Sequence, residues 1–302
     1  MYDVLVVGGG TAGLTAAIYV LRSGKSVMVV EPENFGGQIT YSPKVENFPG
    51  FKSISGNEFA EMLVDQAMEL GAETDFSKVI KIEDSGNIKK VITDSGEFLA
   101  KSVIIATGAK HRHLGIEREE DLSGCGVSYC AVCDGAFFKG KSVAVVGGGN
   151  AALQSAMHLL SYCSKVYLVH RRDSFRGEEH LAARLKEKEN IEFVLDSVVN
   201  RLKGENDLSG ITVKNVKTGE EREIDIDGLF IAVGQEPNNE VFKGFIDLDE
   251  AGYIVSGEDC KTSKMGIFAA GDCRTKSIRQ LTTAAADGTV AALAACSYVD
   301  SI

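Results

Sequence analysis

Near the start of the chain, the pattern of apolar and small residues predicts a strand, a glycine turn, a helix and a second strand. The apolar run Val4–Val7 leads into the glycine-rich stretch Gly8–Gly13. A helical pattern follows over residues 14–22, and a strand over residues 26–30 ends at the polar residue Glu31. This order of elements is typical of a dinucleotide-binding module.

The same pattern returns in the middle of the chain. The strand Ser142–Val146 leads into the glycine turn Gly147–Ala152, and a helix follows through Leu160. A further strand over residues 165–169 ends at His170. The strand-end residue follows the first glycine at the same spacing in both places, so the sequence predicts two modules of one kind.

Glycines in such a turn let the backbone approach a pyrophosphate, and the N-terminus of the following helix offers it unpaired N–H groups. One such turn is a weak signal because glycine turns are common. Two turns, each framed by a strand and a helix, indicate two bound dinucleotides. The turn residues expected to contact them are Gly8, Gly10, Gly13, Gly147, Gly149, Asn150 and Ala152.

The two modules differ in the residue that would meet the adenosine ribose. Glu31 of the first module can accept hydrogen bonds from ribose hydroxyls and would repel a 2′-phosphate, which suits FAD. The second module has guanidinium groups there and no carboxylate, and guanidinium groups bind phosphate bidentately. That composition favours NADPH over NADH. The residues expected to bind its 2′-phosphate end are His170, Arg171, Arg172 and Arg176.

A solvated basic turn is the alternative for these arginines. Arg172 precedes Asp173, and Arg176 lies three residues before Glu179, so the charges could pair with each other on the surface.

Three further apolar runs decide the domain organisation. Residues 102–108 and 229–234 occupy the place of a later strand in each module, and residues 266–272 form another strand that ends in an acid. We assign this last strand to the first domain. An α/β fold with two Rossmann-like domains is expected, the NADPH domain being inserted into the FAD domain. The expected domains are residues 1–112 (FAD, first part), 113–238 (NADPH, with the cysteine pair) and 239–302 (FAD, second part).

Candidate redox chemistry lies at Cys130 and Cys133. Two cysteines separated by two residues can close a small disulfide at a turn or helix start, where the local field lowers a thiol pKa. Such a pair can cycle between dithiol and disulfide. Asp134 could accept and return protons during the exchange, or serve as a turn or capping residue.

Zinc binding is the alternative for this pair, but it needs a second pair or histidines at ligand spacing. Cys125 and Cys163 have the wrong intervals, and His111 and His113 lie upstream. No metal is therefore expected.

Composition limits the remaining function classes. The chain has 302 residues, a net charge of −11 and seven cysteines. The acidic balance disfavours nucleic-acid or anionic-membrane binding, and no run is long enough to span a bilayer. An odd number of scattered cysteines, with no signal peptide ahead of the first strand, favours a reducing cytoplasm.

With these motifs in order, the chain resembles the bacterial low-molecular-weight thioredoxin reductases from end to end. The matching stretches are Gly8–Gly13, Gly36–Gln38, Glu46–Gly50, Ala106–Gly108, Cys130–Gly135, Gly147–Ala152, His170–Arg172 with Arg176, and Gly271–Asp272 through Arg279–Leu281.

The resemblance implies FAD contacts that spacing does not show. These involve Glu31, Gly37, Gln38, Asn47, Thr107, Gly108, Gly271, Asp272, Arg279, Gln280 and Leu281.

It also implies roles at the cysteine pair. Cys133 would face the flavin, Cys130 would attack the disulfide of thioredoxin, and Asp134 would be their acid–base partner. The family is homodimeric, and its NADPH domain turns relative to the FAD domain. Hinges are then expected near residues 110–116 and 236–242.

Some positions depart from what the family leads us to expect. Ala151 replaces a hydroxyl residue in the second glycine turn, and Cys125 replaces an arginine. A disulfide between Cys125 and Cys130 is conceivable, although we treat Cys125 as a bystander. Residues 284–295 predict a helix packed on the FAD domain, with Asp287 and Gly288 interrupting its apolar stripe.

Three other functions stay open at this stage. A ferredoxin-fed flavoenzyme would lack the second glycine turn and its arginines, which this chain keeps. A reductase of another dithiol protein would usually have an extra N-terminal domain. A flavin-binding sensor would not need Cys130 and Cys133 for turnover.

Overall fold

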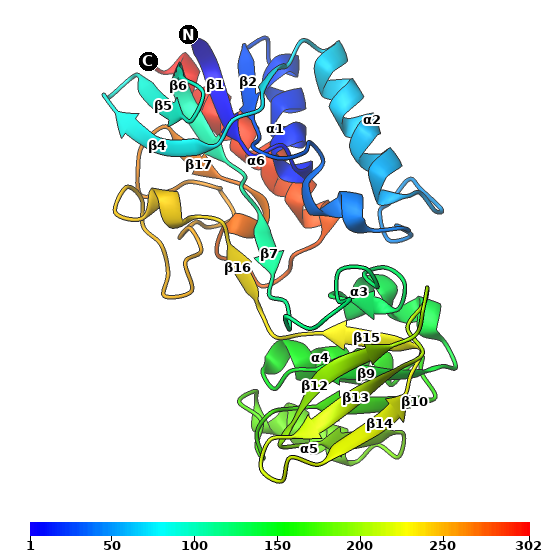
Figure 1. Ribbon diagram of the computed structural model, residues 1–302. Helices are drawn as coiled ribbons and strands as arrows, with labels where there is room; N and C mark the ends of the chain where they lie inside the picture. The colour runs from blue at the N-terminus through cyan, green and yellow to red at the C-terminus, as the bar shows by residue number, and fades with distance from the viewer. The chain divides into compact units, whose positions relative to one another are not determined.

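The computed structural model describes all residues, Met1–Ile302. The chain divides into two compact units (Figure 1). The first unit comprises Met1–Lys110 and Glu236–Ile302, and the second comprises His111–Gln235. The second unit is therefore inserted between two segments of the first. The chain passes between them in β7 (Ala109–His111) and in β16 (Gln235–Pro237).

The first unit contains a seven-stranded sheet in the order β3-β2-β1-β6-β5-β4, with β17 paired to β6. The parallel strands are β1 (Tyr2–Val7), β2 (Val27–Val30), β3 (Glu73–Asp75), β6 (Glu97–Ile105) and β17 (Ile267–Ala269). Two antiparallel strands, β4 (Val79–Asp84) and β5 (Lys89–Thr93), extend the sheet. Because β17 pairs in parallel with β6, the strand expected to return to the first unit does so.

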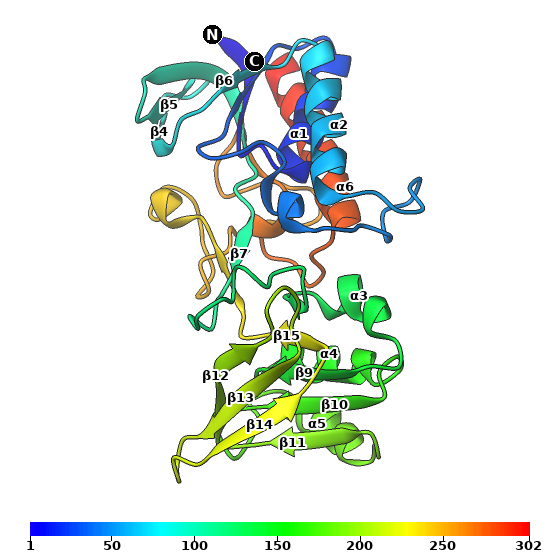
Figure 2. The same cartoon turned by 45° about the vertical axis from the view of Figure 1, so that its right-hand side comes forward.

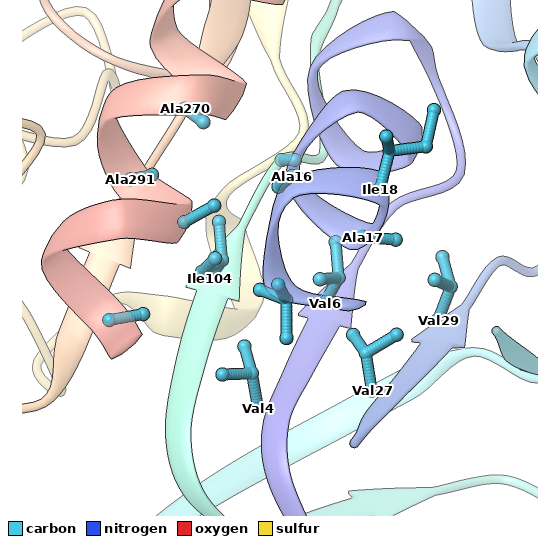
Figure 3. Close-up of a cluster of buried hydrophobic side chains, with 14 of the residues drawn as sticks. Val4, Val6, Ala16, Ala17, Ile18, Val27, Val29, Ile104, Ala270 and Ala291 are labelled. Atoms are coloured by element: carbon cyan, nitrogen blue, oxygen red, sulfur yellow. The ribbon is translucent and has the colours of Figure 1, made fainter. Parts of the chain in front are cut away.

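Both faces of this sheet are buried. Val4, Val6 and Ile104 lie on the face toward the helices, in one apolar cluster (Figure 3). Leu5 and Val7 belong to a second cluster on the other face, since successive side chains of a strand point in opposite directions. The helices of the unit are α1 (Thr11–Arg22), α2 (Gly56–Glu69) and α6 (Leu281–Asp300).

The C-terminal helix α6 is longer than the alanine-rich run predicts. Its N-cap Gln280 and Thr283 form a reciprocal capping box, so the helix already begins at Leu281. Asp287 and Gly288 do not interrupt its packing, because both are buried inside the helix. A Cβ at Gly288 would lie 2.3 Å from the carbonyl oxygen of Ala12, so α1 and α6 are in close contact there.

The second unit contains a five-stranded parallel sheet in the order β11-β10-β9-β15-β8. Its strands are β8 (Val127–Ser128), β9 (Ser142–Val146), β10 (Lys165–Val169), β11 (Ile191–Val194) and β15 (Gly228–Ile231). A separate antiparallel sheet places β12 (Ser197–Lys203), β13 (Gly210–Asn215) and β14 (Glu221–Asp225) side by side (Figure 2). The helices are α3 (Ala131–Asp134), α4 (Asn150–Leu159) and α5 (Glu179–Lys186).

The parallel sheet of the second unit is also covered on both faces. Ala144 and Val146 belong to the cluster shared with the antiparallel sheet, whereas Val143 and Val145 pack with Leu153 of α4. Such continuous apolar strands are typical of parallel sheets. None of the helices in either unit combines the length and apolar character needed to cross a membrane.

Candidate functional site

The first glycine turn joins β1 to α1, and at several of its positions a Cβ would clash. Gly8 has a φ of +110°, and a Cβ there would lie 2.3 Å from the carbonyl oxygen of Ala106. A Cβ at Gly13 would lie 1.9 Å from the carbonyl oxygen of Gly8. Gly10 is the N-cap of α1, and a Cβ at Gly37 would lie 3.1 Å from its Cα. The predicted residues therefore form one tight backbone cradle.

Glu31, directly after β2, is held against this turn. Its carboxylate accepts hydrogen bonds from the backbone N–H of Gly9 at 2.8 Å and of Glu33 at 3.0 Å. The acid thus lies at the end of the strand, beside the second glycine, where a ribose would meet it.

The structure joins four of the residues that the resemblance assigns to FAD. The Asn47 amide donates to the side-chain oxygen of Gln280 at 3.3 Å, and Arg279 Nε donates to the carbonyl of Asp272 at 3.3 Å. Because Leu281 is the first residue of α6, these groups surround the N-terminus of that helix.

Two further predicted residues are anchored near the end of the first segment. The Gln38 amide donates to the carbonyl of Ala109, and the Thr107 hydroxyl donates to Asn239 at 2.9 Å. Gly108, which lies between Thr107 and Ala109 in the sequence, has a φ of +68°. Asn239 is buried and was not singled out from sequence, because an Asn in a loop gives no periodic signal.

Asp272 has an unpaired polar atom that fits a bound cofactor. Its Oδ1 is buried without a hydrogen-bond partner. Burial raises the pKa of its carboxyl, while Lys276 and Arg279 oppose that shift. A buried acceptor of this kind normally has a donor, so a hydroxyl or N–H of a bound group would satisfy it. The first unit therefore fits a flavin dinucleotide.

A buried ionic network holds the backbone around Gly271 and Asp272. This network was missed by the sequence analysis. Asp287 accepts from Arg274 Nε and Nη2, both at 2.8 Å, from Lys276 Nζ at 2.8 Å and from the backbone N–H of Gly271 at 2.9 Å. Burial opposes ionisation, but the hydrogen bonds from Arg274 and Lys276 hold the pKa of Asp287 below its ordinary value. The network fixes the backbone that carries Asp272.

The second glycine turn joins β9 to α4 and meets a different side chain. A Cβ at Gly148 would lie 2.1 Å from the ring of His170, so the imidazole lies over that glycine. Its ring also stacks on Phe175, with centroids 5.5 Å apart. Burial and then the positive charges of the neighbouring arginines lower the pKa of His170. Its buried Nε2 has no partner, which again leaves a polar atom for a ligand.

The remaining predicted residues of this turn are held within the second unit. Gly149 is the N-cap of α4, and Ala152 is buried in the helix. The Asn150 amide oxygen accepts from the backbone N–H of Glu178 at 2.7 Å, and its amide nitrogen donates to the Glu178 carboxylate at 3.0 Å. These bonds fasten the chain segment after the arginines to the start of α4.

The three arginines after β10 do not pair with carboxylates. Their side chains are exposed and form no ion pair; they are Arg171, Arg172 and Arg176. Asp173 instead pairs with Lys217 at 3.1 Å. The backbone N–H of Arg176 donates to the carbonyl of Gly148 at 2.7 Å, which places this arginine at the glycine turn. The pairing of these arginines with Asp173 or Glu179 on the surface therefore does not occur.

Cys130 and Cys133 are joined as a disulfide at the start of α3. Cys130 is the N-cap of the helix, and its Sγ accepts from the backbone N–H of Cys133 at 3.2 Å. Cys125 is exposed and unpaired, so the alternative Cys125–Cys130 disulfide does not form. No group of three or more His, Cys, Asp or Glu side chains in the chain could hold a metal ion.

Asp134 follows the pair and is half-buried. Burial raises the pKa of its carboxyl, and a hydrogen bond from the Ser128 hydroxyl at 2.6 Å opposes that shift. A raised pKa suits a carboxyl that accepts and returns a proton. Ser128 was not singled out from sequence.

Tyr129, directly before Cys130, is also anchored. Its hydroxyl donates to the buried carboxylate of Glu119 at 2.8 Å and lies 3.0 Å from Nδ1 of His113. Glu119 also accepts from the backbone N–H groups of Leu114 at 3.0 Å and Gly115 at 2.9 Å. Burial, followed by the hydrogen bond to Glu119, raises the pKa of Tyr129. Sequence reasoning missed this contact because it joins segments separated by a loop.

Known proteins match the whole chain. The family profile described as pyridine nucleotide-disulphide oxidoreductase matches residues 2–288. The thioredoxin reductase of Bacillus subtilis is 42% identical over 303 residues, covering 100% of this chain and 96% of that protein. A 34.2 kDa protein in the rubredoxin operon of Clostridium pasteurianum is 43% identical over 298 residues, covering 98% and 97%.

The solved structures agree. The crystal structure of thioredoxin reductase from Streptococcus pyogenes MGAS5005 matches with a TM-score of 0.97 and 42% identity, covering 100% of this chain and 99% of that one. The chain therefore belongs to the pyridine nucleotide-disulphide oxidoreductases and, among them, to the thioredoxin reductases of the bacterial type.

Proposed function

We propose that the chain is an NADPH-dependent thioredoxin-disulfide reductase. The observation that carries this proposal is the Cys130–Cys133 disulfide beside the half-buried Asp134, in a chain with two glycine turns of opposite charge character. FAD, when bound, supplies a group that takes a hydride from a nicotinamide and gives two electrons to a disulfide.

The first unit would hold FAD. Its orphaned Asp272 oxygen, the glycine cradle and the carboxylate beside the turn all support this assignment. The residues proposed to hold it are Gly8, Gly10, Gly13, Glu31, Gly37, Gln38, Asn47, Thr107, Gly108, Gly271, Asp272, Arg279, Gln280 and Leu281.

The second unit would hold NADPH. The unpaired guanidinium groups near His170 support recognition of a 2′-phosphate, because no carboxylate at the strand end repels it. The residues proposed to hold it are Gly147, Gly149, Asn150, Ala152, His170, Arg171, Arg172 and Arg176.

The cysteine pair would then reduce thioredoxin by dithiol–disulfide exchange. The Cys130 thiolate attacks one sulfur of thioredoxin's disulfide, which forms a mixed disulfide and releases the other sulfur as a thiolate. The Asp134 carboxyl gives its proton to that thiolate and then takes the proton of the Cys133 thiol. The Cys133 thiolate attacks Cys130 Sγ, the enzyme disulfide closes again, and the second thioredoxin thiolate takes a proton from water.

A homodimer in a reducing compartment is part of the same proposal. An apolar cavity of about 410 Å³ on the first unit is lined by residues of α1, α2 and α6, such as Phe59, and by Phe48 and Phe51 from the segment before α2. Such an apolar hollow supports contact with a second copy. The five cysteines outside the pair are all free thiols, which supports the cytoplasm.

The test is anaerobic NADPH consumption by the purified protein with and without thioredoxin, for the wild type and Cys130→Ser. We expect turnover that requires both thioredoxin and Cys130. Reduction of the flavin by ferredoxin but not by NADPH would contradict the proposal and indicate the ferredoxin-fed alternative. Full turnover in Cys130→Ser would exclude any role of the pair, as expected of a flavin sensor.

A further inference from the structure

Ser128 lies at the end of β8, two residues before Cys130, and its hydroxyl has several partners in the redox segment. The residue is 6% exposed. Its Oγ lies 2.6 Å from Oδ2 of Asp134 and accepts from the backbone N–H of Cys130 at 3.1 Å. It also lies 3.4 Å from the carbonyl oxygen of Cys130. One buried hydroxyl therefore touches both the first cysteine of the pair and the acid that follows the second.

Backbone hydrogen bonds also connect Cys130 with Cys133 and with Asp134. The N–H of Asp134 donates to the carbonyl of Cys130 at 3.1 Å, and the N–H of Cys133 donates to Cys130 Sγ at 3.2 Å. The Asp134 side chain is held at its outer end by Ser128. Without that hydroxyl, the carboxyl would keep its backbone anchor but lose its side-chain partner.

A hydroxyl suits both protonation states of a carboxyl. It has one donor and two acceptor sites. When Asp134 is ionised, Ser128 donates to it while accepting from the N–H of Cys130. When Asp134 carries the proton, Asp134 can donate to Ser128, and the serine proton can turn to the carbonyl of Cys130. The contacts at 2.6 Å, 3.1 Å and 3.4 Å are compatible with both arrangements.

Few other titratable groups face Asp134. Helix α4 and the short helix over Gly135–Phe138 pack against α3. The latter carries no titratable side chain, and α4 presents His158, whose ring lies 3.6 Å from where a Cβ of Gly135 would be. The redox segment itself adds the thiols of Cys130 and Cys133 in the reduced state. Burial raises the pKa of Asp134, and Ser128 is the group that opposes the shift.

We propose that Ser128 is a positioning residue for dithiol–disulfide exchange, which holds the Asp134 carboxyl beside the cysteine pair in both of its protonation states. This inference rests on the proposed thioredoxin reductase activity. It assigns to Ser128 no contact with thioredoxin or with either cofactor. Its effect on the reaction passes through Asp134.

The test compares Ser128→Thr with Ser128→Val, which have nearly the same shape and differ in the hydroxyl. For each, kcat/KM for thioredoxin is measured across pH with saturating NADPH. Because Asp134 acts as an acid, the activity that depends on it falls as pH rises through its pKa. The hydroxyl stabilises the carboxylate, so its loss should move that descending limb to higher pH. We also expect Ser128→Val to lower kcat/KM about tenfold.

Three comparisons make the result decisive. Asp134→Asn should remove the limb altogether, which assigns it to Asp134. Ser197→Ala removes an equally buried hydroxyl of the same unit, bonded to the carbonyl of Leu195, and should leave the profile unchanged. Should the packing of Val lower the yield of folded protein, Ser128→Ala provides the same comparison with less bulk.

A limb at the same pH in Ser128→Thr and Ser128→Val would overturn the inference, even if both variants were slower. Its failure is distinct from failure of the proposed function. If only the inference about Ser128 fails, the wild-type protein still reduces thioredoxin and shows the descending limb. If the proposed function fails, the wild-type protein does not reduce thioredoxin at all.

Discussion

The two glycine turns have the same place in their units, but a carboxylate lies beside the first and an imidazole with neighbouring arginines lies beside the second. In the first, the Glu31 carboxylate accepts from the N–H of Gly9. In the second, the ring of His170 covers Gly148, and the neighbouring arginines form no ion pair. Under the proposed function, the residue at the end of the second strand would select between a dinucleotide without and one with a 2′-phosphate.

The turns also differ in how tightly they close. At Gly13, a Cβ would lie 1.9 Å from the carbonyl oxygen of Gly8, so this position excludes any side chain. The corresponding position of the second turn is Ala152, which is buried with its methyl group in place. At this position the first turn has therefore less tolerance for substitution than the second.

The largest effect should come from adding that methyl group to the first turn. Gly13→Ala forces the backbone of Gly8 to move, and we expect a loss of about 3 kcal/mol in the free energy of unfolding together with loss of bound FAD. Urea unfolding followed by flavin fluorescence measures both. Gly149→Ala is the matched control in the second turn, because a Cβ there meets nothing within 4 Å. Normal FAD retention in Gly13→Ala would contradict the tight cradle.

A smaller effect should come from removing the unpaired positive charges. Arg171→Ala combined with Arg176→Ala should raise KM for NADPH about 100-fold, because a hydrogen bond to a charged group contributes about 1.5–3 kcal/mol. The KM for NADH should hardly change. Steady-state kinetics with both nucleotides measure the ratio, and the exposed Arg201→Ala serves as control. Equal effects on the two nucleotides would disprove 2′-phosphate recognition.

The smallest effect should be a dependence of stability on pH from His170. Its pKa is lowered in the folded protein, so the unfolded chain binds the proton more readily below about pH 6.5. The free energy of unfolding is therefore higher at neutral pH and decreases as the pH falls. Urea unfolding at about pH 7.5 and about pH 5.5 should show a smaller difference for His170→Asn than for the wild type. An unchanged difference would mean that His170 does not titrate on unfolding.

Much of the fold could be predicted because its strands are continuous apolar runs. The strands predicted over residues 142–146 and 165–169 coincide with β9 and β10. The helix predicted from Leu14 instead begins at Thr11, because Gly10 already caps it. Local patterns thus find an element well and its ends less well.

The supporting contacts of the site could not be predicted in the same way. Asp287 is reached by Arg274 and Lys276 from a preceding loop, and Tyr129 is reached by Glu119 across a turn. Such contacts depend on how segments fold against each other, which no period in the sequence encodes. Asp287 does interrupt the apolar stripe of its helix, as expected, but its role as the anchor of the neighbouring loop could not be predicted.

The central claim is that electrons from NADPH reach thioredoxin through the Cys130–Cys133 pair. The most direct measurement counts free thiols formed in oxidised thioredoxin per NADPH consumed, without oxygen, for the wild type and Cys130→Ser. A two-electron transfer predicts about two thiols per NADPH in the wild type and none in the variant. NADPH consumption by the wild type with no thiols formed in thioredoxin would contradict the account.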